Sequence, residues 1–197
     1  ENGQELPVIY QPIYETQGLP DTVYEIRAAE DVVTPDGTLR YSKGELVDTV
    51  TTDEMGFAES KELYLGKYEV KEVKAGYGMV LSDEVHTVEL IYAGQNVAVT
   101  ETASSFVNER QKVEVSLEKA LETSELFGIG SNGEIKNISF GLFSDEELVS
   151  ASGTSIPKDG LLEIITLDEN GKATVKTDLP LGSYYVKELA TDEHYQL

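Results

Sequence analysis

An internal repeat constrains this chain more than any other feature of its sequence. Residues 65–72 read Leu-Gly-Lys-Tyr-Glu-Val-Lys-Glu and residues 181–188 read Leu-Gly-Ser-Tyr-Tyr-Val-Lys-Glu, so six of the eight positions are identical at an offset of 116 residues. At the same offset, the Gly-Thr pair at 37–38 returns at 153–154. Ordered matches over so long a span predict two copies of one module.

The repeat divides the 197 residues into two modules of ordinary domain size. We expect the first module to span 1–109 and the second to span 110–197. Leu197 aligns with Leu81, so the second module is expected to lack its last strands in this chain. Residues 1–18 are interpreted either as the first strand of the first module or as a leading linker.

The pattern of side chains predicts strands in both modules. Apolar and polar residues alternate at 23–26, 67–71, 88–92 and 112–117. Turn-forming clusters separate such stretches, for example at 35–37, 159–160 and 169–171. Many short strands with frequent turns predict an all-β fold of two tandem β-sandwich modules. The only helical candidates are two short stretches, about 28–32 and 144–149.

The composition excludes several classes of function. Asp and Glu number 37 against 15 Lys and Arg, which gives a net charge of −22. Such a surface repels the phosphates of nucleic acids and of anionic lipids. The chain has no cysteine, so disulfides, thiolate catalysis and cysteine-bound zinc are excluded. No apolar run approaches the ~20 residues of a membrane span, so we expect no membrane contact by this fragment.

We expect neither a cofactor nor a metal. The two histidines, His86 and His194, fall in different modules, which argues against a shared metal site. The glycine-rich stretch 128–133 resembles a phosphate loop, but it lacks the Lys-Ser/Thr that would follow and lies in a very acidic chain. It is interpreted as a surface loop inserted in the second module.

Four segments resemble elements of one known family. Residues 66–72 resemble the G-x-Y-x-V-x-E segment of the collagen-adhesin B-type (Cna B-type) domains, the SpaA-like, prealbumin-fold repeat domains of Gram-positive adhesins and pilins. Residues 106–110 resemble the Asn-bearing last strand of these domains, residues 113–119 their Lys-bearing first strand, and residues 138–143 the strand that follows. The resemblance covers nearly the whole chain and implies a prealbumin-like (Ig-like) sandwich for each module.

The family resemblance also implies an intramolecular isopeptide bond. A lysine amine on the first strand attacks an asparagine carboxamide on the last strand, and a buried glutamate assists. Lys119 and Glu188 match the lysine and the glutamate in the second module. Burial in an apolar core favours the neutral, nucleophilic amine and a protonated carboxyl that can polarise the amide. The reaction occurs once per molecule, so the chain is not expected to be an enzyme.

The first module matches only part of this set. Glu72 and Asn108 match the glutamate and the asparagine, but alignment of the two first strands places Pro12 where Lys119 stands. We therefore expect the first module to be inactive for want of a lysine. In the second module the matching asparagine falls beyond Leu197, so no standard bond is expected to be complete within these residues.

Each of these residues also has a plainer interpretation. Glu72 and Glu188 could be exposed strand residues, Lys119 a solvated lysine, and Asn108 a cap of the turn into the second module. The repetition of the whole motif favours the family role for Glu188 over exposure on a strand.

The leading functional hypothesis is a structural stalk or spacer of an extracellular, cell-wall-anchored adhesin or pilus-like protein, with the sorting signal outside this fragment. Its partners would be neighbouring modules of the same protein. The alternative is a ligand-binding adhesin module for a host matrix protein or glycan, for which the 11 tyrosines offer aromatic surface. No catalytic constellation supports an enzyme with turnover.

Overall fold

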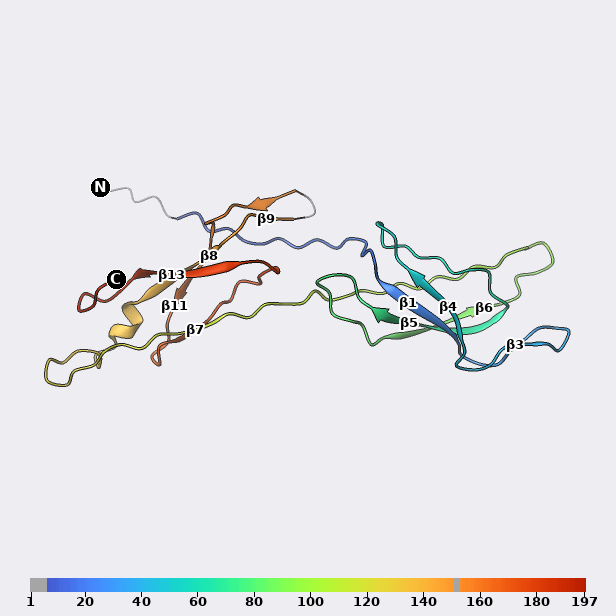
Figure 1. The fold of residues 1–197 in the computed structure, drawn as a ribbon, viewed down its shortest axis with the longest axis horizontal. Coiled ribbons are helices and arrows are strands. Elements are labelled where there is room, and N and C mark those ends of the chain that lie inside the picture. Colours follow the sequence, from blue (N-terminus) through green and yellow to red (C-terminus); the bar gives the residue numbers. More distant parts are fainter. Residues whose placement is uncertain (1–6, 151–152) are drawn as a thin grey trace. The chain divides into compact units, whose positions relative to one another are not determined.

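The structure, a computed structural model, describes residues 7–150 and 153–197. These residues form two compact units, whose strands can be followed in Figure 1. The first unit is Thr16–Gln111, and the second is Lys112–Leu197 together with the described residues up to Glu15. Within these ranges the regular elements are strands, apart from one 3-10 turn, η1 (Glu134–Asn137). The prediction of an all-β fold is confirmed.

A four-stranded antiparallel sheet forms the centre of the first unit. Its order is β4 (Leu46–Thr51), β1 (Val23–Ala28), β5 (Gly66–Lys74) and β6 (Val85–Leu90). A hairpin of β2 (Val32–Val33) and β3 (Leu39–Tyr41) turns at Gly37, whose φ of 82° suits glycine. An isolated bridge between Met79 and Arg110 attaches the last stretch of the unit.

The repeated motif builds β5 and the core behind it. Tyr68 and Glu72 are both fully buried, because alternate side chains of a strand point to the same face. The Tyr68 hydroxyl donates a 2.6 Å hydrogen bond to the carbonyl oxygen of Tyr64, four residues upstream. This bond fixes the loop that leads into β5. The tyrosine ring belongs to a cluster of buried apolar side chains: Ile26, Ala28, Val32 and Val47.

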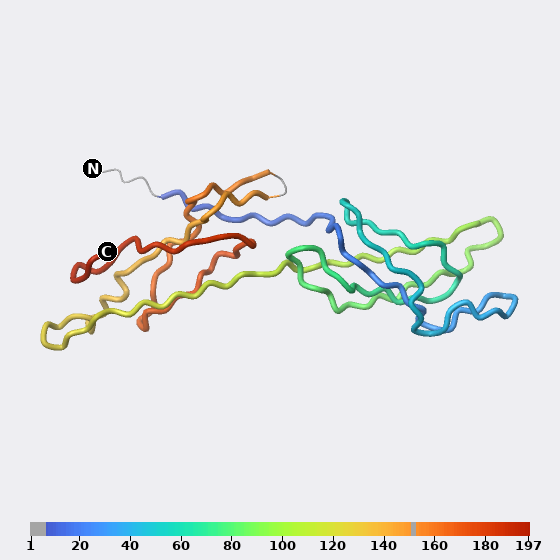
Figure 2. Tube along the Cα trace, in the orientation of Figure 1, coloured from blue at the N-terminus to red at the C-terminus, as the bar shows by residue number. Residues whose placement is uncertain are grey.

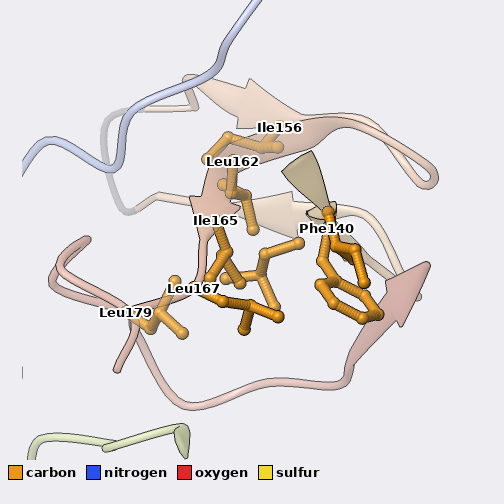
Figure 3. Close-up of a cluster of buried hydrophobic side chains, with 8 residues drawn as sticks. Phe140, Ile156, Leu162, Ile165, Leu167 and Leu179 are labelled. Atoms are coloured by element: carbon orange, nitrogen blue, oxygen red, sulfur yellow. The ribbon is translucent and has the colours of Figure 1, made fainter. Parts of the chain in front are cut away.

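The second unit contains a three-stranded sheet and two smaller two-stranded ones. The three-stranded sheet has the order β11 (Leu161–Thr166), β8 (Ser139–Ser144) and β13 (Tyr184–Ala190), and one two-stranded sheet pairs β12 (Lys172–Thr174) with β7 (Ser116–Glu118). Leu117 and Ala173 of this smaller sheet pack against the core. Figure 3 shows this core, which consists of Ile138, Phe140, Leu142, Ile156, Leu162, Ile165, Leu167 and Leu179. A short hairpin joins β9 (Leu148–Val149) to β10 (Ser155–Ile156).

The two main sheets share one strand arrangement. In the first unit β1 lies between β4 and β5, and in the second unit β8 lies between β11 and β13. The Tyr184 hydroxyl donates a 2.6 Å bond to the carbonyl oxygen of Pro180, the same four-residue reach that Tyr68 makes. The internal repeat of the sequence thus has a counterpart in strand order and in local hydrogen bonding.

The N-terminal segment departs from the predicted boundary. The sequence predicts that residues 1–18 belong to the first module. In the structure, residues 7–15 pack on the second unit instead. The backbone N–H of Tyr10 donates to the carbonyl oxygen of Leu161 at 2.8 Å, and the Tyr10 ring packs against the core of this unit. Strand β11 is an edge of its sheet, so its backbone groups are open to such a segment. Figure 2 follows the chain from this segment (blue) into the first unit.

Pro12 therefore belongs to the second unit. It lies between Tyr10 and Tyr14, and the Tyr14 hydroxyl donates to the carbonyl oxygen of Asp178 at 2.7 Å. The sequence alignment that set Pro12 against Lys119 is wrong, because the segment it aligned is not part of the first unit.

The two predicted helical stretches form other structure. At 28–32 the chain ends β1 and enters β2, and at 144–149 it ends β8 and enters β9. The backbone N–H of Ala28 donates to the carbonyl oxygen of Glu45 at 3.0 Å, so this hydrogen bond is made to a residue outside 28–32 and not within a helical turn. Stretches this short cannot offset the free energy of helix nucleation. The strands predicted at 23–26 and 67–71 lie within β1 and β5.

Replacement of Tyr68 with Phe should lower the free energy of unfolding of the first unit by about 1 to 2 kcal/mol, because the Tyr64 carbonyl loses its donor. Denaturant unfolding followed by circular dichroism measures the loss. The matched change Tyr184→Phe should lower the stability of the second unit instead. Identical unfolding curves for wild type and Tyr68→Phe would contradict the role given to this hydroxyl.

Candidate functional site

A buried carboxylate with several donors lies towards the end of β5. Glu72 is fully buried, and both of its oxygens accept hydrogen bonds from Asn108 Nδ2 at 2.8 Å. The backbone N–H of Ser82 donates to Oε1 at 3.1 Å, and the Tyr24 hydroxyl donates to Oε2 at 3.4 Å. A buried carboxylate is costly unless such donors satisfy it. One side chain therefore joins β1, β5 and the last stretch of the first unit.

Further contacts hold that last stretch in place. Asn108 Nδ2 also donates to the carbonyl oxygen of Val80 at 3.1 Å. The ring of Phe106 lies 4.8 Å from the ring of Tyr24 and 4.0 Å from that of His86, measured between centroids. Asn108 thus does more than cap a turn, because its side chain is tied to the buried carboxylate.

Tyr24 is a site residue that the sequence did not single out. Burial, and then the neighbouring Glu72 carboxylate, raise the pKa of Tyr24 to about 12. The hydroxyl therefore keeps its proton, and remains a donor, through neutral and mildly alkaline pH. The one sequence signal is that the repeat aligns Tyr24 with Phe140, so the hydroxyl occurs in one copy only.

The second unit holds a carboxylate at the corresponding place. Lys119 Nζ donates to Glu188 Oε2 at 3.0 Å, an ion pair between residues 69 positions apart. The two side chains are 33% and 21% exposed, so the pair is only partly screened by water. Glu188 Oε1 is buried and has no hydrogen-bond partner among the residues described. One oxygen of this carboxylate is occupied, and the other lacks a donor.

Close backbone packing brings Lys119 to this position. Its N–H donates to the carbonyl oxygen of Gly171 at 2.8 Å. Gly171 has φ 74°, and a Cβ atom at this residue would lie 2.2 Å from the carbonyl oxygen of Lys119. Both facts require glycine here. The Asn-Gly turn before β12 is therefore part of what positions the lysine.

The structure places the four sequence-predicted residues in two pairs. Asn108 lies against Glu72 in the first unit, and Lys119 lies against Glu188 in the second. Neither glutamate is a solvated strand residue. The pairs differ in charge, because the hydrogen bonds described for Glu72 come from uncharged groups, whereas Glu188 receives one from an ammonium group.

The glycine-rich loop at 128–133 binds a carboxylate of its own chain. Glu134 is almost fully buried, and it accepts hydrogen bonds from the backbone N–H groups of Gly130 at 2.9 Å and Asn132 at 2.6 Å. Backbone hydrogen bonds, that of its own N–H first, lower the pKa of Glu134. The N–H groups that could cradle a phosphate are thus used internally, which agrees with a surface loop.

A second polar cluster lies after β13. Asp192 is buried, and it accepts 2.6 Å hydrogen bonds from Asn137 Nδ2 and from His194 Nδ1. The bond from Asn137, followed by those from His194, lowers the pKa of Asp192. The hydrogen bond with Asp192 raises the pKa of His194. The sequence pattern gave no sign of this cluster.

The described ranges contain no group of three or more His, Cys, Asp or Glu side chains that could hold a metal ion. Their only helical element is one short turn, and nothing in them forms a helix with the length and apolar character of a membrane span.

Replacement of Asn108 with Asp should destabilise the first unit at neutral pH by about 3 kcal/mol, because a second carboxylate then lies against the buried Glu72. Acidification should restore part of the loss, since the two carboxyls can then share a proton. Denaturant unfolding at several pH values measures both effects. The matched control is Asn96→Asp, an exposed turn position. Equal effects of the two changes would contradict the network.

The raised pKa of His194 predicts a pH dependence for the second unit. Its contribution to stability is complete below its ordinary pKa of 6.5 and is lost as the pH rises through the higher folded value. The melting temperature of the second unit should therefore fall as the pH rises above 6.5. His194→Gln should flatten this slope, and His86→Gln, in the first unit, should not. An unaltered slope in the His194 variant would refute the assignment.

Comparison with known proteins finds a family model that matches part of the chain. A family model described as the SpaA prealbumin-like fold domain matches residues 14–105. The chain is also 28% identical, over 141 residues, to the trypsin-resistant surface T6 protein of Streptococcus pyogenes serotype M6. That match covers 71% of this chain and 25% of the relative, so the chain spans about a quarter of the relative's length.

Two solved structures are similar as well. The Bacillus anthracis TIE protein matches with a TM-score of 0.51 and 22% identity, over 89% of this chain and 27% of that one. A streptococcal ancillary pilin matches with a TM-score of 0.32 and 23% identity, over 91% of this chain and 51% of that one. The first likeness supports the fold. The family match covers residues 14–105, a stretch that contains the sheet carrying Glu72 and is similar to the SpaA prealbumin-like fold domain.

Proposed function

We propose that the chain is a structural segment of an extracellular, cell-wall-anchored surface protein, either an adhesin stalk or a pilus-like subunit. Support comes from its similarity to a streptococcal surface protein and from the SpaA-type domain at 14–105. The charge of −22 would keep neighbouring stalks apart and disfavour nucleic acid and anionic membranes as partners. Its partners are then other modules of the same protein, and the chain has no turnover chemistry.

The second unit is proposed to be a second prealbumin-like module. Its main sheet has the order of the first unit's sheet without a counterpart of β6. Its Tyr184 makes the same hydrogen bond as Tyr68, and its Glu188 holds the place of Glu72 along the strand. At the repeat offset, residues 82–109 of the first unit have no counterpart within the 197 residues.

An isopeptide bond is proposed for the second module, with Lys119 as nucleophile and Glu188 as proton carrier. One observation carries this proposal: the amine lies 3.0 Å from one carboxylate oxygen, while the other, buried oxygen has no donor in the part of the chain that the structure describes. In the first unit an asparagine amide nitrogen lies 2.8 Å from both oxygens of the corresponding carboxylate. An asparagine of the last strand would therefore meet the lysine at Glu188.

The proposed reaction is a transamidation. Proton transfer from the Lys119 ammonium to Glu188 gives a neutral amine and a protonated carboxyl. The amine nitrogen forms a bond to the asparagine Cγ, and the carboxyl donates to the carbonyl oxygen as it gains charge. The bond from Cγ to the amide nitrogen then breaks. Glu188 takes a second proton from the attacking nitrogen and passes both protons to the departing amide nitrogen, which leaves as ammonium, so Glu188 ends as the carboxylate it was at the start.

The bond would serve a mechanical role. It would join the first strand of the module to its last strand, so a pulling force would pass through covalent bonds instead of through the sheet. In a chain without cysteine it would take the part that disulfides have in other secreted proteins.

A ligand-binding role is the second candidate, and one feature favours it. The bridge between Ser124 and Ile129 closes a tight loop in the second unit. The loop presents Leu126 and Phe127 to solvent, 87% and 75% exposed. Adjacent exposed apolar side chains of this kind can form a contact surface. A host matrix protein would be a fitting partner for such a tip.

Intact-mass measurement tests the isopeptide proposal. A chain extended past Leu197 to include the position 116 residues after Asn108 should fold with a mass deficit of one ammonia. Lys119→Arg should abolish the deficit, because the guanidinium cannot act as the nucleophile, and Glu188→Ala should abolish it because the proton carrier is lost.

The matched control is Lys136→Arg, an exposed lysine of the same unit, which should leave the deficit unchanged. A folded, extended wild-type chain that keeps its full mass would rule out the isopeptide proposal while leaving the structural role intact.

A further inference from the structure

The same strand position carries different residues in the two units. Tyr24 of β1 is the cross-strand partner of Glu72, and Phe140 of β8 is the cross-strand partner of Glu188. The side chains differ by a single hydroxyl group. Because strand order and register agree, this hydroxyl is a local difference between two otherwise equivalent carboxylate sites.

The hydroxyl has a definite partner. In the first unit it donates to Glu72 Oε2 at 3.4 Å, and in the second unit Lys119 Nζ donates to Glu188 Oε2 at 3.0 Å. In each unit one side chain thus donates to the Oε2 oxygen of the carboxylate: the Tyr24 phenol at Glu72 and the Lys119 ammonium at Glu188. Phe140 has no such group, and its ring packs in the core of the second unit.

The first unit also offers no side chain where the lysine would stand. A Cβ atom on Gly56 would lie 2.7 Å from the Cα atom of Gly18, so Gly18 packs against this turn as Lys119 packs against the turn at Gly171. A Cβ atom on Gly18 would itself lie 2.0 Å from the carbonyl oxygen of Met55. Without a backbone shift, no amine can be presented from this position.

We infer that the residue at the Tyr24/Phe140 position sets which donor the carboxylate receives: a tyrosine makes the site a permanent hydrogen-bonded clamp, and a phenylalanine leaves the donor position open to a lysine. Tyr24 fills the donor position at Glu72 and fixes that carboxylate as an acceptor for Asn108. Phe140 leaves the donor position at Glu188 to Lys119. The claim for Phe140 rests on the proposed isopeptide function, and Phe140 acts there as a positioning residue. The claim for Tyr24 stands without that function.

The test in the second unit uses the chain extended past Leu197. Phe140→Tyr should lower the rate of ammonia loss, followed by intact mass after refolding, by at least about ten-fold, because the new hydroxyl competes with Lys119 for Glu188. The matched variant Phe140→Leu removes ring contacts without adding a donor, and it should retain most of the rate. Circular dichroism checks that both variants fold.

The outcomes separate the two proposals. Wild type that never loses ammonia overturns the isopeptide function and, with it, the claim for Phe140. Wild type that loses ammonia, with Phe140→Tyr equally fast, overturns the claim for Phe140 alone. Equal slowing in the Tyr and Leu variants assigns the effect to packing and also overturns it.

The test in the first unit uses the 197 residues as they stand. Tyr24→Phe should speed hydrogen exchange of the Val80 and Gln111 amides about five-fold or more, because these N–H groups hold the last stretch through Glu109 and Gly78. Tyr92→Phe, an exposed tyrosine, should leave their exchange unchanged. Unchanged exchange in the Tyr24 variant would overturn the clamp.

Discussion

The requirement that a buried carboxylate be given donors organises the first unit of this protein. The side chain of Glu72 points inward because it follows Tyr68 and Val70 on the same face of β5. Once there, it must be satisfied by groups from outside its own strand, and the chain provides them from β1 and from the stretch that contains Asn108. The need for hydrogen-bond donors thus determines which distant segments pack together, whereas apolar contacts alone would allow several arrangements.

The tyrosine four residues before each glutamate makes this possible. Tyr68 and Tyr184 both fix the loop that enters their strand by a hydrogen bond to the carbonyl oxygen four residues upstream. The start of the strand is therefore set independently of the carboxylate site. The glutamate can then be met by uncharged donors in one unit and by an ammonium in the other without any change in strand order. The same strand order thus holds a hydrogen-bonded Glu72–Asn108 pair in one unit and a Glu188–Lys119 ion pair in the other.

Sequence reasoning located strands of the main sheets because they depend on local pattern, whereas the candidate site residues came from the family resemblance. The alternation around Tyr68 predicted β5, and the repeat predicted that Glu188 would share the setting of Glu72. It failed for Pro12, since no local pattern says that a segment will pack on a unit more than 100 residues later in the chain. It also overlooked Tyr24, because the value of a hydroxyl depends on what lies opposite in the sheet. Propensity alone could not reject the short helices, whose backbone groups bond across strands.

The N-terminal segment has a consequence for the order in which the protein folds. Tyr14 and Asp178 are joined by a hydrogen bond across 164 positions, and the intervening chain includes the whole first unit. Closing so long a loop in a flexible chain carries a large entropic penalty, which slows folding. If the first unit folds beforehand, most of that loop is already a compact body. During synthesis Tyr10 and Tyr14 therefore stay exposed until the second unit has been made. We expect the first unit to fold before the second.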